Sequence, residues 1–425
     1  MMMERTLKFL LGFALLLPLP AHANTFDQKS LESLLQKNPR TGLPVQTIAE
    51  LVPLLPQELR ENFTFVYDSR SPFRASISHQ KPRTILFSAD GRLILTFTGD
   101  ASKPGFDLLE TISFQDETAT FEPKAYVLPA AERRGESADQ TRCVQCHGKD
   151  PRPIFDSYPL WPGFYGSIQD SFPPELAVSQ KELAHYKNFL EGEAKRGVYK
   201  DLLFSTSSPV PPYLDPAHFS RESLVGDVKH FPHMPNTRLG MALTELNRKR
   251  IYRLLKSGPH FQPNEKKILA ELLNCGPSQI SQREIDLALA KTKLENRERL
   301  VRLGVNPDDP KQRMNDMVEL AEARSLARIN WAAKLAGAER KEWAMALEPN
   351  SASLFDGILS GIYHGRSYYL TEDILFEGLA GLCQREEKIC AYFKPLPVYE
   401  KLGYKFGNRL SIGLARRSCT LLLSR

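Results

Sequence analysis

Two cysteines and a histidine stand together at Cys143, Cys146 and His147, in the pattern Cys-x-x-Cys-His. Thiols three positions apart lie on one short helical turn, so both can bond to the same planar ligand or to the same metal ion. The adjacent imidazole is then held where one of its nitrogens can coordinate iron. The spacing therefore predicts one covalently attached c-type haem, with thioether bonds from the two thiols and an iron bond from His147.

Two other chemistries also use closely spaced cysteines. A structural zinc site needs four ligands, commonly a second Cys or His pair at short spacing, and no such pair lies near Cys143. A redox-active dithiol occurs where a thioredoxin-like strand meets a helix, whereas the residues before this motif, Pro129–Gln140, form a polar and charged connector. The context of the motif therefore favours haem attachment.

The N-terminal stretch is typical of an export signal. Arg5 and Lys8 precede an apolar run from Phe9 to Leu17, and Ala21–His22–Ala23 places small residues where a signal peptidase cleaves. The run is shorter than the roughly 20 apolar residues that cross a bilayer. We expect residues 1–23 to be removed, which leaves a periplasmic protein without a membrane anchor.

The overall charge argues against a nucleic-acid partner. The formal net charge is +6, and loss of Glu4, Arg5 and Lys8 with the signal reduces it to +5. No compact Lys/Arg run interleaved with aromatic residues concentrates this charge. The sequence also contains no nucleotide-binding loop, HExxH, GxSxG or EF-hand pattern, and no constellation of acidic residues that predicts catalysis.

The other four cysteines are Cys275, Cys383, Cys390 and Cys419. In an oxidising compartment an even number of cysteines fits two disulfides, and three pairings are open. Free buried thiols are the alternative.

Local patterns predict several elements. Short helical pieces punctuated by prolines are expected over 30–55, and a small antiparallel sheet over 62–128 with one face covered by these helices. Strands 84–87 and 93–97 are joined through Asp90–Gly91, a strong hairpin signal. Ser281 and Glu284 form a capping box that opens a helix. Helices are expected near 174–197 and over 244–256, 281–303 and 313–336.

Over roughly Asp139 to Lys256 the sequence resembles the mono-haem c-type cytochromes. In that family a proline after the motif accepts a hydrogen bond from the ligating histidine through its carbonyl group. Pro159 has the matching spacing, with Pro153 and Pro162 as alternatives. Such a bond orients the imidazole ring and raises its basicity.

The resemblance also implies a sixth iron ligand. The family places a methionine shortly before a terminal amphipathic helix, and Met234 precedes the predicted helix 244–256. Met241, His230 and His233 are alternative ligands, as is an open sixth position. The distance from His147 to Met234 exceeds that of compact members and requires an insertion.

Other residues near the motif have two interpretations each. Five aromatic residues can line a haem crevice or belong to an ordinary core: Phe155, Tyr158, Trp161, Phe164 and Tyr165. Arg152 and Arg238 can pair with haem propionates or lie on the surface. The histidines without ligand spacing are interpreted as structural or exposed: His185, His218, His260 and His364.

The segment CHGKDPRPIFDSYPLWPGFYGS is further similar to exported bacterial proteins with one haem motif.

From the predicted strands and helices, together with the resemblance, we expect a multidomain α+β protein. The expected parts are a signal peptide (1–23), a β-rich N-terminal domain (24–128), an all-α cytochrome c-like haem domain (129–258) and a mainly helical C-terminal domain (259–425).

Three functions remain open at this point. The first is a periplasmic electron-transfer cytochrome with one haem c per chain and a redox partner protein. The second is a haem enzyme or a gas or redox sensor with an open or displaceable sixth iron position, because simple electron carriage does not account for the C-terminal residues. The third is a structural haem in a protein whose flanking domains bind another protein.

Overall fold

A computed structural model of the chain describes six long stretches and several shorter pieces. The long stretches are 26–67, 77–100, 105–129, 180–204, 252–302 and 316–338. The shorter pieces are 102, 147, 151, 164–165, 239, 242–243, 246, 249–250, 306, 308, 378–379, 381–385, 393–394, 409–410 and 419–423. The predicted signal residues 1–23 lie outside the described residues.

Four short helical segments come first: α1 (Gln28–Gln36), α2 (Ile48–Leu51), the 3-10 helix η1 (Val52–Leu54) and α3 (Gln57–Glu61). Asp27 and Thr47 begin α1 and α2, because their side-chain oxygens accept hydrogen bonds from the first backbone N–H groups. A proline lies in the first turn of η1, and Pro56 directly precedes α3. Proline is tolerated there because the backbone N–H groups at the start of a helix have no acceptor within the helix. The predicted short helices are confirmed.

Five antiparallel strands form one sheet in sequential order: β1 (Phe63–Val66), β2 (Arg83–Phe87), β3 (Leu93–Phe97), β4 (Leu108–Gln115) and β5 (Thr120–Val127). The predicted hairpin between β2 and β3 is confirmed, with Phe87 opposite Ile94. Gly91 in its turn has φ +70°, which favours glycine. A Cβ atom on Gly91 would lie 2.7 Å from the Cβ atom of Ala242, so the turn also needs glycine for this close approach.

Apolar side chains pack on both faces of the sheet, because successive residues of a strand point to opposite faces and most residues of β1 to β3 are buried. Phe63 and Phe65 belong to a core shared with Leu31 and Leu35 of α1, as predicted for the early helices. The opposite face also has a cover, which the sequence did not predict. Its core contains residues of the sheet together with Phe164 and three leucines of the later chain: Ile85, Phe87, Ile94, Ile112, Phe114, Phe121, Leu239, Leu243 and Leu246.

The predicted helix near 174–197 is present as α5 (Gln180–Glu191), followed by the 3-10 helices η3 (Glu193–Lys195) and η4 (Gly197–Tyr199). Tyr186 and Phe189 of α5 pack in the same core as Phe65, whose ring centroid lies 5.0 Å from that of Phe189. The Tyr199 hydroxyl donates a 2.6 Å hydrogen bond to the Pro82 carbonyl. Residues that follow Cys143–His147 in sequence therefore pack, together with α1, on the first face of the sheet.

Helical residues between 239 and 256 connect two cores. Leu243 and Leu246 face the sheet, whereas Leu254 and Leu255 pack in a second core with α9 (Phe261–Leu272). These leucines are the apolar positions predicted for a helix over 244–256. The helical residues end before Gly258, where a Cβ atom would lie 2.3 Å from the Ala336 carbonyl oxygen.

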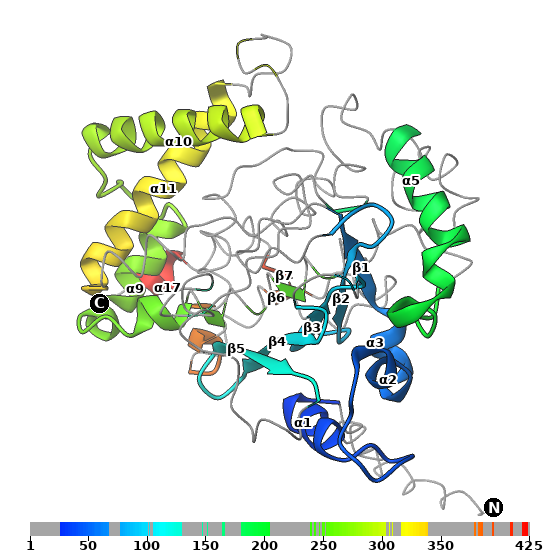
Figure 1. Ribbon diagram of the computed structural model, residues 1–425. Coiled ribbons are helices and arrows are strands. Elements are labelled where there is room, and N and C mark those ends of the chain that lie inside the picture. The colour runs from blue at the N-terminus through cyan, green and yellow to red at the C-terminus, as the bar shows by residue number, and fades with distance from the viewer. Residues whose placement is uncertain are drawn as a thin grey trace, which may run out of the picture.

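The C-terminal half is mainly helical and includes α10 (Gln282–Arg302), α11 (Asp316–Ala336) and α17 (Cys419–Leu423), together with the two-residue strands β6 (Phe393–Lys394) and β7 (Arg409–Leu410). The predicted capping box is confirmed: the Ser281 N–H donates to Glu284 Oε2 at 2.8 Å, and the Glu284 N–H donates to Ser281 Oγ at 3.3 Å. In Figure 1, α9, α11 and α17 group on one side of the sheet, and α5 lies by β1 on the other.

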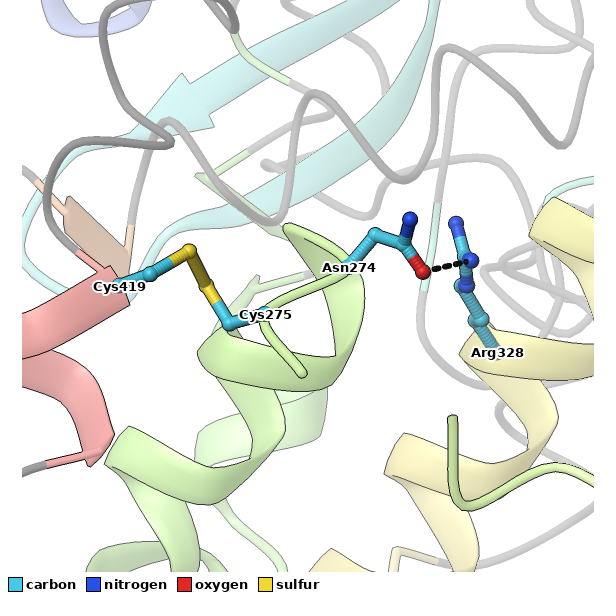
Figure 2. The surroundings of a disulfide bond; sticks show 4 residues. All are labelled: Asn274, Cys275, Arg328 and Cys419. Carbon is cyan, nitrogen blue, oxygen red and sulfur yellow. Dashed lines mark hydrogen bonds between the residues drawn. A yellow bond between two sulfur atoms is a disulfide. The ribbon is translucent and has the colours of Figure 1, made fainter. Parts of the chain in front are cut away.

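A disulfide joins Cys275, just after α9, to Cys419, the first residue of α17, across a sequence separation of 144. Figure 2 shows this bond beside Asn274, whose side-chain oxygen accepts a 2.7 Å hydrogen bond from Arg328 of α11. Cys383 is also disulfide-bonded, and its partner lies outside the described residues. The structure thus selects one pairing that the sequence left open.

The coarse fold prediction is confirmed: an antiparallel sheet precedes a mainly helical region. The domain limits after 128 and 258 stay predictions. Residues on the two sides of each limit pack in the same core. Phe65 and Phe189 share a core across the limit after 128, and Leu255 and Phe261 share one across the limit after 258.

Candidate functional site

Only one predicted haem-binding residue belongs to the described part of the chain. His147 is helical and partly buried, and it interacts with other groups of the protein. Cys143, Cys146, Pro159 and Met234 lie outside the described residues. The alternative iron ligands, the alternative prolines, the two arginines and three of the aromatic residues also lie outside the described residues: Met241, His230, His233, Pro153, Pro162, Arg152, Arg238, Phe155, Tyr158 and Trp161.

The chain that carries the motif is attached to the sheet at two places. Val127 ends β5, and the following N–H of Leu128 donates to the Asp107 carbonyl at 2.9 Å. On the far side of the motif, Phe164 forms an antiparallel bridge with Val66, the last residue of β1. Because β1 and β5 are the two edge strands, the motif-bearing segment leaves one edge of the sheet and returns at the other.

Both attachment points lie at the same end of the sheet. The strand register places Val66 opposite Arg83 and Leu108 opposite Val127, so β1 and β5 finish at this end. Four inter-strand spacings separate the two edges, a distance of about 19 Å. The motif at 143–147 therefore belongs to a connection between two corners at one end of the sheet.

Tyrosine and histidine side chains cluster at the β1 corner. The Tyr165 N–H donates to the Phe65 carbonyl at 3.1 Å, which fixes Tyr165 beside β1. The His79 ring stacks on Tyr67 with ring centroids 4.2 Å apart, and on His185 with centroids 4.0 Å apart and planes inclined by 9°. The Tyr186 ring lies 5.0 Å from that of Tyr165.

Tyr165 and His79 also form a closed pair of hydrogen bonds. The Tyr165 hydroxyl donates to the His79 carbonyl at 3.0 Å, and the same oxygen lies 3.0 Å from His79 Nδ1. Because the phenol has one proton, Nδ1 must carry the hydrogen of the second bond. Burial, with Glu182 and Tyr67 nearby, raises the pKa of the Tyr165 hydroxyl well above its usual value, so the phenol stays protonated.

A partly buried ion pair lies on the second face of the sheet, at the same end. Arg83 of β2 forms a salt bridge with Glu110 of β4, and Arg83 Nε donates to Thr96 Oγ1 at 2.9 Å. Burial lowers the pKa of the Arg83 guanidinium to about 10, which still leaves it charged at neutral pH. The pair places a fixed positive and a fixed negative charge between the two corners.

The other end of the sheet has a separate polar contact. Asp116 accepts hydrogen bonds of 2.7 and 2.9 Å from Arg92, and Lys249 lies 3.3 Å away from the same carboxylate. The hydrogen bonds from Arg92 hold the pKa of the Asp116 carboxyl below its usual value. This contact attaches the helical residues near 249 to the turn that follows β4.

Sequence reasoning missed the Tyr–His cluster. Phe164 and Tyr165 were expected either in a haem crevice or in an ordinary core, and both are buried. His185 was interpreted as structural or exposed, and it stacks on His79. No local signal predicts the group, because Tyr67, His79, Tyr165 and His185 come from three distant parts of the chain.

Within the described stretches, no group of three or more His, Cys, Asp or Glu side chains is arranged to hold a metal ion. The helices of the same stretches include none that is both long and apolar enough to cross a membrane. No protein-family model, curated protein or solved structure matches the chain.

Proposed function

We propose that this chain is an exported c-type cytochrome that carries one covalent haem and transfers electrons to a partner protein. The observation that carries the proposal is the complete motif Cys143-x-x-Cys146-His147. The helical, partly buried state of His147 fits the short helical turn that this attachment needs. The proposed location is the periplasm, after removal of residues 1–23.

The disulfides support an oxidising compartment, which is also where c-type haem is attached. Cytoplasmic proteins rarely keep structural disulfides, whereas exported proteins use them commonly. Cys275 pairs with Cys419, and Cys383 has a disulfide partner as well. If Cys143 and Cys146 hold haem, the remaining partner for Cys383 is Cys390. The haem proposal thus requires a definite second disulfide.

The haem group would supply one-electron chemistry at its iron. The role of the protein residues is to bind that group, to orient it and to exclude water from it. Cys143 and Cys146 would hold its edge and His147 would coordinate its iron, with the Pro159 carbonyl orienting the imidazole. Met234 is the proposed sixth ligand, and a thioether in that place favours a high reduction potential.

We further propose that the cytochrome c-like region 129–258 folds together with the sheet rather than beside it. Its described parts supply the cover of both sheet faces: α5 packs on the first, and Leu243 and Leu246 pack on the second. The corners at Leu128 and Phe164 then act as fixed ends for the haem-bearing connection.

The test is production of the full chain in a periplasm that contains a haem-attachment system. We expect the denatured protein to retain the absorbance and the added mass of one haem, and peptide mapping to find Cys383 joined to Cys390. Cys143→Ser with Cys146→Ser should abolish the attached haem. Cys275→Ser with Cys419→Ser is the matched control and should retain it. Wild-type protein with zinc, or with a disulfide, at Cys143 and Cys146 would refute the proposal.

A further inference from the structure

Three rings form one continuous stack at the β1 corner of the sheet, where α5 lies beside β1 (Figure 1). The His79 ring stacks on Tyr67 with centroids 4.2 Å apart, and on His185 with centroids 4.0 Å apart. Two rings cannot share one face of an imidazole at these distances, so Tyr67 and His185 cover opposite faces of His79. His185 belongs to α5, whereas His79 belongs to the segment that leads into β2. The stack therefore joins two distant parts of the chain.

Each imidazole of the stack can bind one more proton. The Tyr165 hydroxyl donates to the His79 carbonyl, so His79 Nδ1 carries the hydrogen of its bond to the same hydroxyl oxygen. The neutral His79 ring therefore takes up a further proton at Nε2. Both histidines are partly exposed, so water can deliver a proton to either ring. Imidazoles change charge between about pH 5 and 8.

Two neighbours favour a single proton on the stack. Glu182 lies one turn before His185 on α5, and a carboxylate at this spacing attracts a positive imidazole. Burial and the negative charge of Glu182 also raise the pKa of the nearby Tyr165 hydroxyl. The Tyr67 ring presents its π face to His79, which attracts a cation as well. One positive charge is therefore accommodated.

The other described groups around the stack do not compensate a second positive charge. Burial raises the pKa of the Tyr165 and Tyr186 hydroxyls, so both phenols stay neutral. Lys181 of α5 is exposed and adds a positive charge. Lys81 and Asp100 form an ion pair with each other at 3.2 Å. Among the described residues, the surroundings therefore balance one proton and not two.

We propose that the His79–His185 stack is a pH-sensitive switch, which holds α5 in place while the two rings share no more than one proton. The ring planes are inclined by only 9°, and a centroid distance of 4.0 Å leaves no room for water or an anion between them. Two protonated rings at this distance repel each other. The separated rings bind two protons and the stacked rings one, so a fall in pH favours separation.

Opening of the stack loosens α5 without unfolding the sheet. The apolar contacts of α5 do not titrate, and the Phe189 ring lies 5.0 Å from that of Phe65 in the first-face core. These contacts continue to hold α5 when the rings separate. The expected change is therefore local to α5 and to the segment that carries His79. This inference is independent of the haem.

The first experiment measures backbone hydrogen exchange of the full chain by mass spectrometry at about pH 7.5 and about pH 5. Rates are corrected for the intrinsic effect of pH. We expect peptides from α5 to exchange about tenfold faster at the lower pH, whereas peptides from β2 and β3 keep their protection.

Two variants identify the origin of this change. His185→Phe keeps a flat ring in the stack that cannot be protonated, and it should abolish the effect of acid on α5. His260→Gln, at an exposed histidine next to α9, is the matched control and should behave as the wild type. Equal protection of α5 at both pH values in the wild type, or an undiminished acid effect in His185→Phe, would overturn the proposal.

A count of bound protons tests the pair in the unsubstituted chain. In protein labelled at histidine Cε1, the NMR shift of each imidazole carbon reports its protonation, and His79→Phe and His185→Phe assign the two signals. Summed over both rings, the change from about pH 8 to about pH 5.5 should equal that of one proton, with the second bound only at lower pH. Two complete and independent titrations within that range would refute the switch.

Discussion

Tyr165 and His79 lie 86 positions apart in sequence and bind each other through two hydrogen bonds of 3.0 Å. One bond joins the phenol to the imidazole, and the other joins the same phenol to the backbone of His79. Tyr165 is fully buried and attached to β1 through its own N–H. The pair thus connects the chain that follows the Cys143–His147 motif to the segment that leads into β2.

Tyr165→Phe removes both hydrogen bonds and leaves the ring in place. We expect it to lower the free energy of unfolding by about 1–2 kcal/mol, since each buried hydrogen bond contributes about 0.5–1.5 kcal/mol net. Urea unfolding followed by circular dichroism measures the change.

The His79→Phe variant and the double variant complete a thermodynamic cycle with Tyr165→Phe. His79→Phe keeps a flat ring between Tyr67 and His185 but removes the Nδ1 donor. A coupling free energy of about 1 kcal/mol is expected between the two positions. Additive effects of the two substitutions would show that the side-chain bond contributes nothing.

Asp116→Asn should reduce stability in a pH-dependent way. The ordinary pKa of an aspartate is near 3.8, and the hydrogen bonds from Arg92 lower that of Asp116 in the folded protein. The ionised carboxylate therefore stabilises the fold fully above about pH 5, and this contribution is lost as the pH falls through the folded pKa. The carboxylate is 48% exposed, so the expected loss at pH 7 is only about 0.5 kcal/mol.

The measurement compares denaturation midpoints of wild type and Asp116→Asn from pH 7 down to pH 3. The two curves should converge below about pH 4. Glu117→Gln, at the adjacent exposed position, serves as control and should show no such convergence. A constant difference at all pH values would contradict the electrostatic origin.

Removal of the Cys275–Cys419 disulfide should destabilise the C-terminal helices. The bond closes a loop with a sequence separation of 144, and loops of that length predict a loss of up to about 5 kcal/mol. We expect Cys275→Ala with Cys419→Ala to lower the thermal midpoint under non-reducing conditions. A reductant should lower the thermal midpoint of the wild type by at least as much as this double substitution does, because the reductant also breaks the disulfide of Cys383.

Met234→Ala tests whether Met234 occupies the sixth coordination position of the proposed haem iron. Loss of a thioether ligand should convert a low-spin spectrum to a high-spin one and allow carbon monoxide to bind the reduced protein. Met241→Ala is the matched control and should leave the spectrum unchanged. A wild type that already binds carbon monoxide would instead favour the enzyme or sensor function, with an open sixth position.

Features determined by neighbouring residues could be predicted from the sequence alone. The Cys143–His147 motif, the Asp90–Gly91 hairpin and the Ser281–Glu284 capping box each depend on a few adjacent positions, whose backbone preferences and hydrogen bonds are local. The hairpin and the capping box are present in the structure as predicted. The leucines of the helix over 244–256 were also predicted, because an apolar face follows from helical periodicity.

Contacts between residues that are far apart in sequence were decided by the tertiary structure. Cys275 pairs with Cys419, and Tyr165 with His79, because packing of the whole chain brings them together, and no local rule selects among such partners. The cover of the second sheet face by Leu243 and Leu246 has the same origin. Sequence determined which groups can do chemistry at residues 143–147. The fold decided that the chain around them starts and ends at two corners of one sheet, because the bridge between Phe164 and Val66 joins segments that lie far apart in sequence.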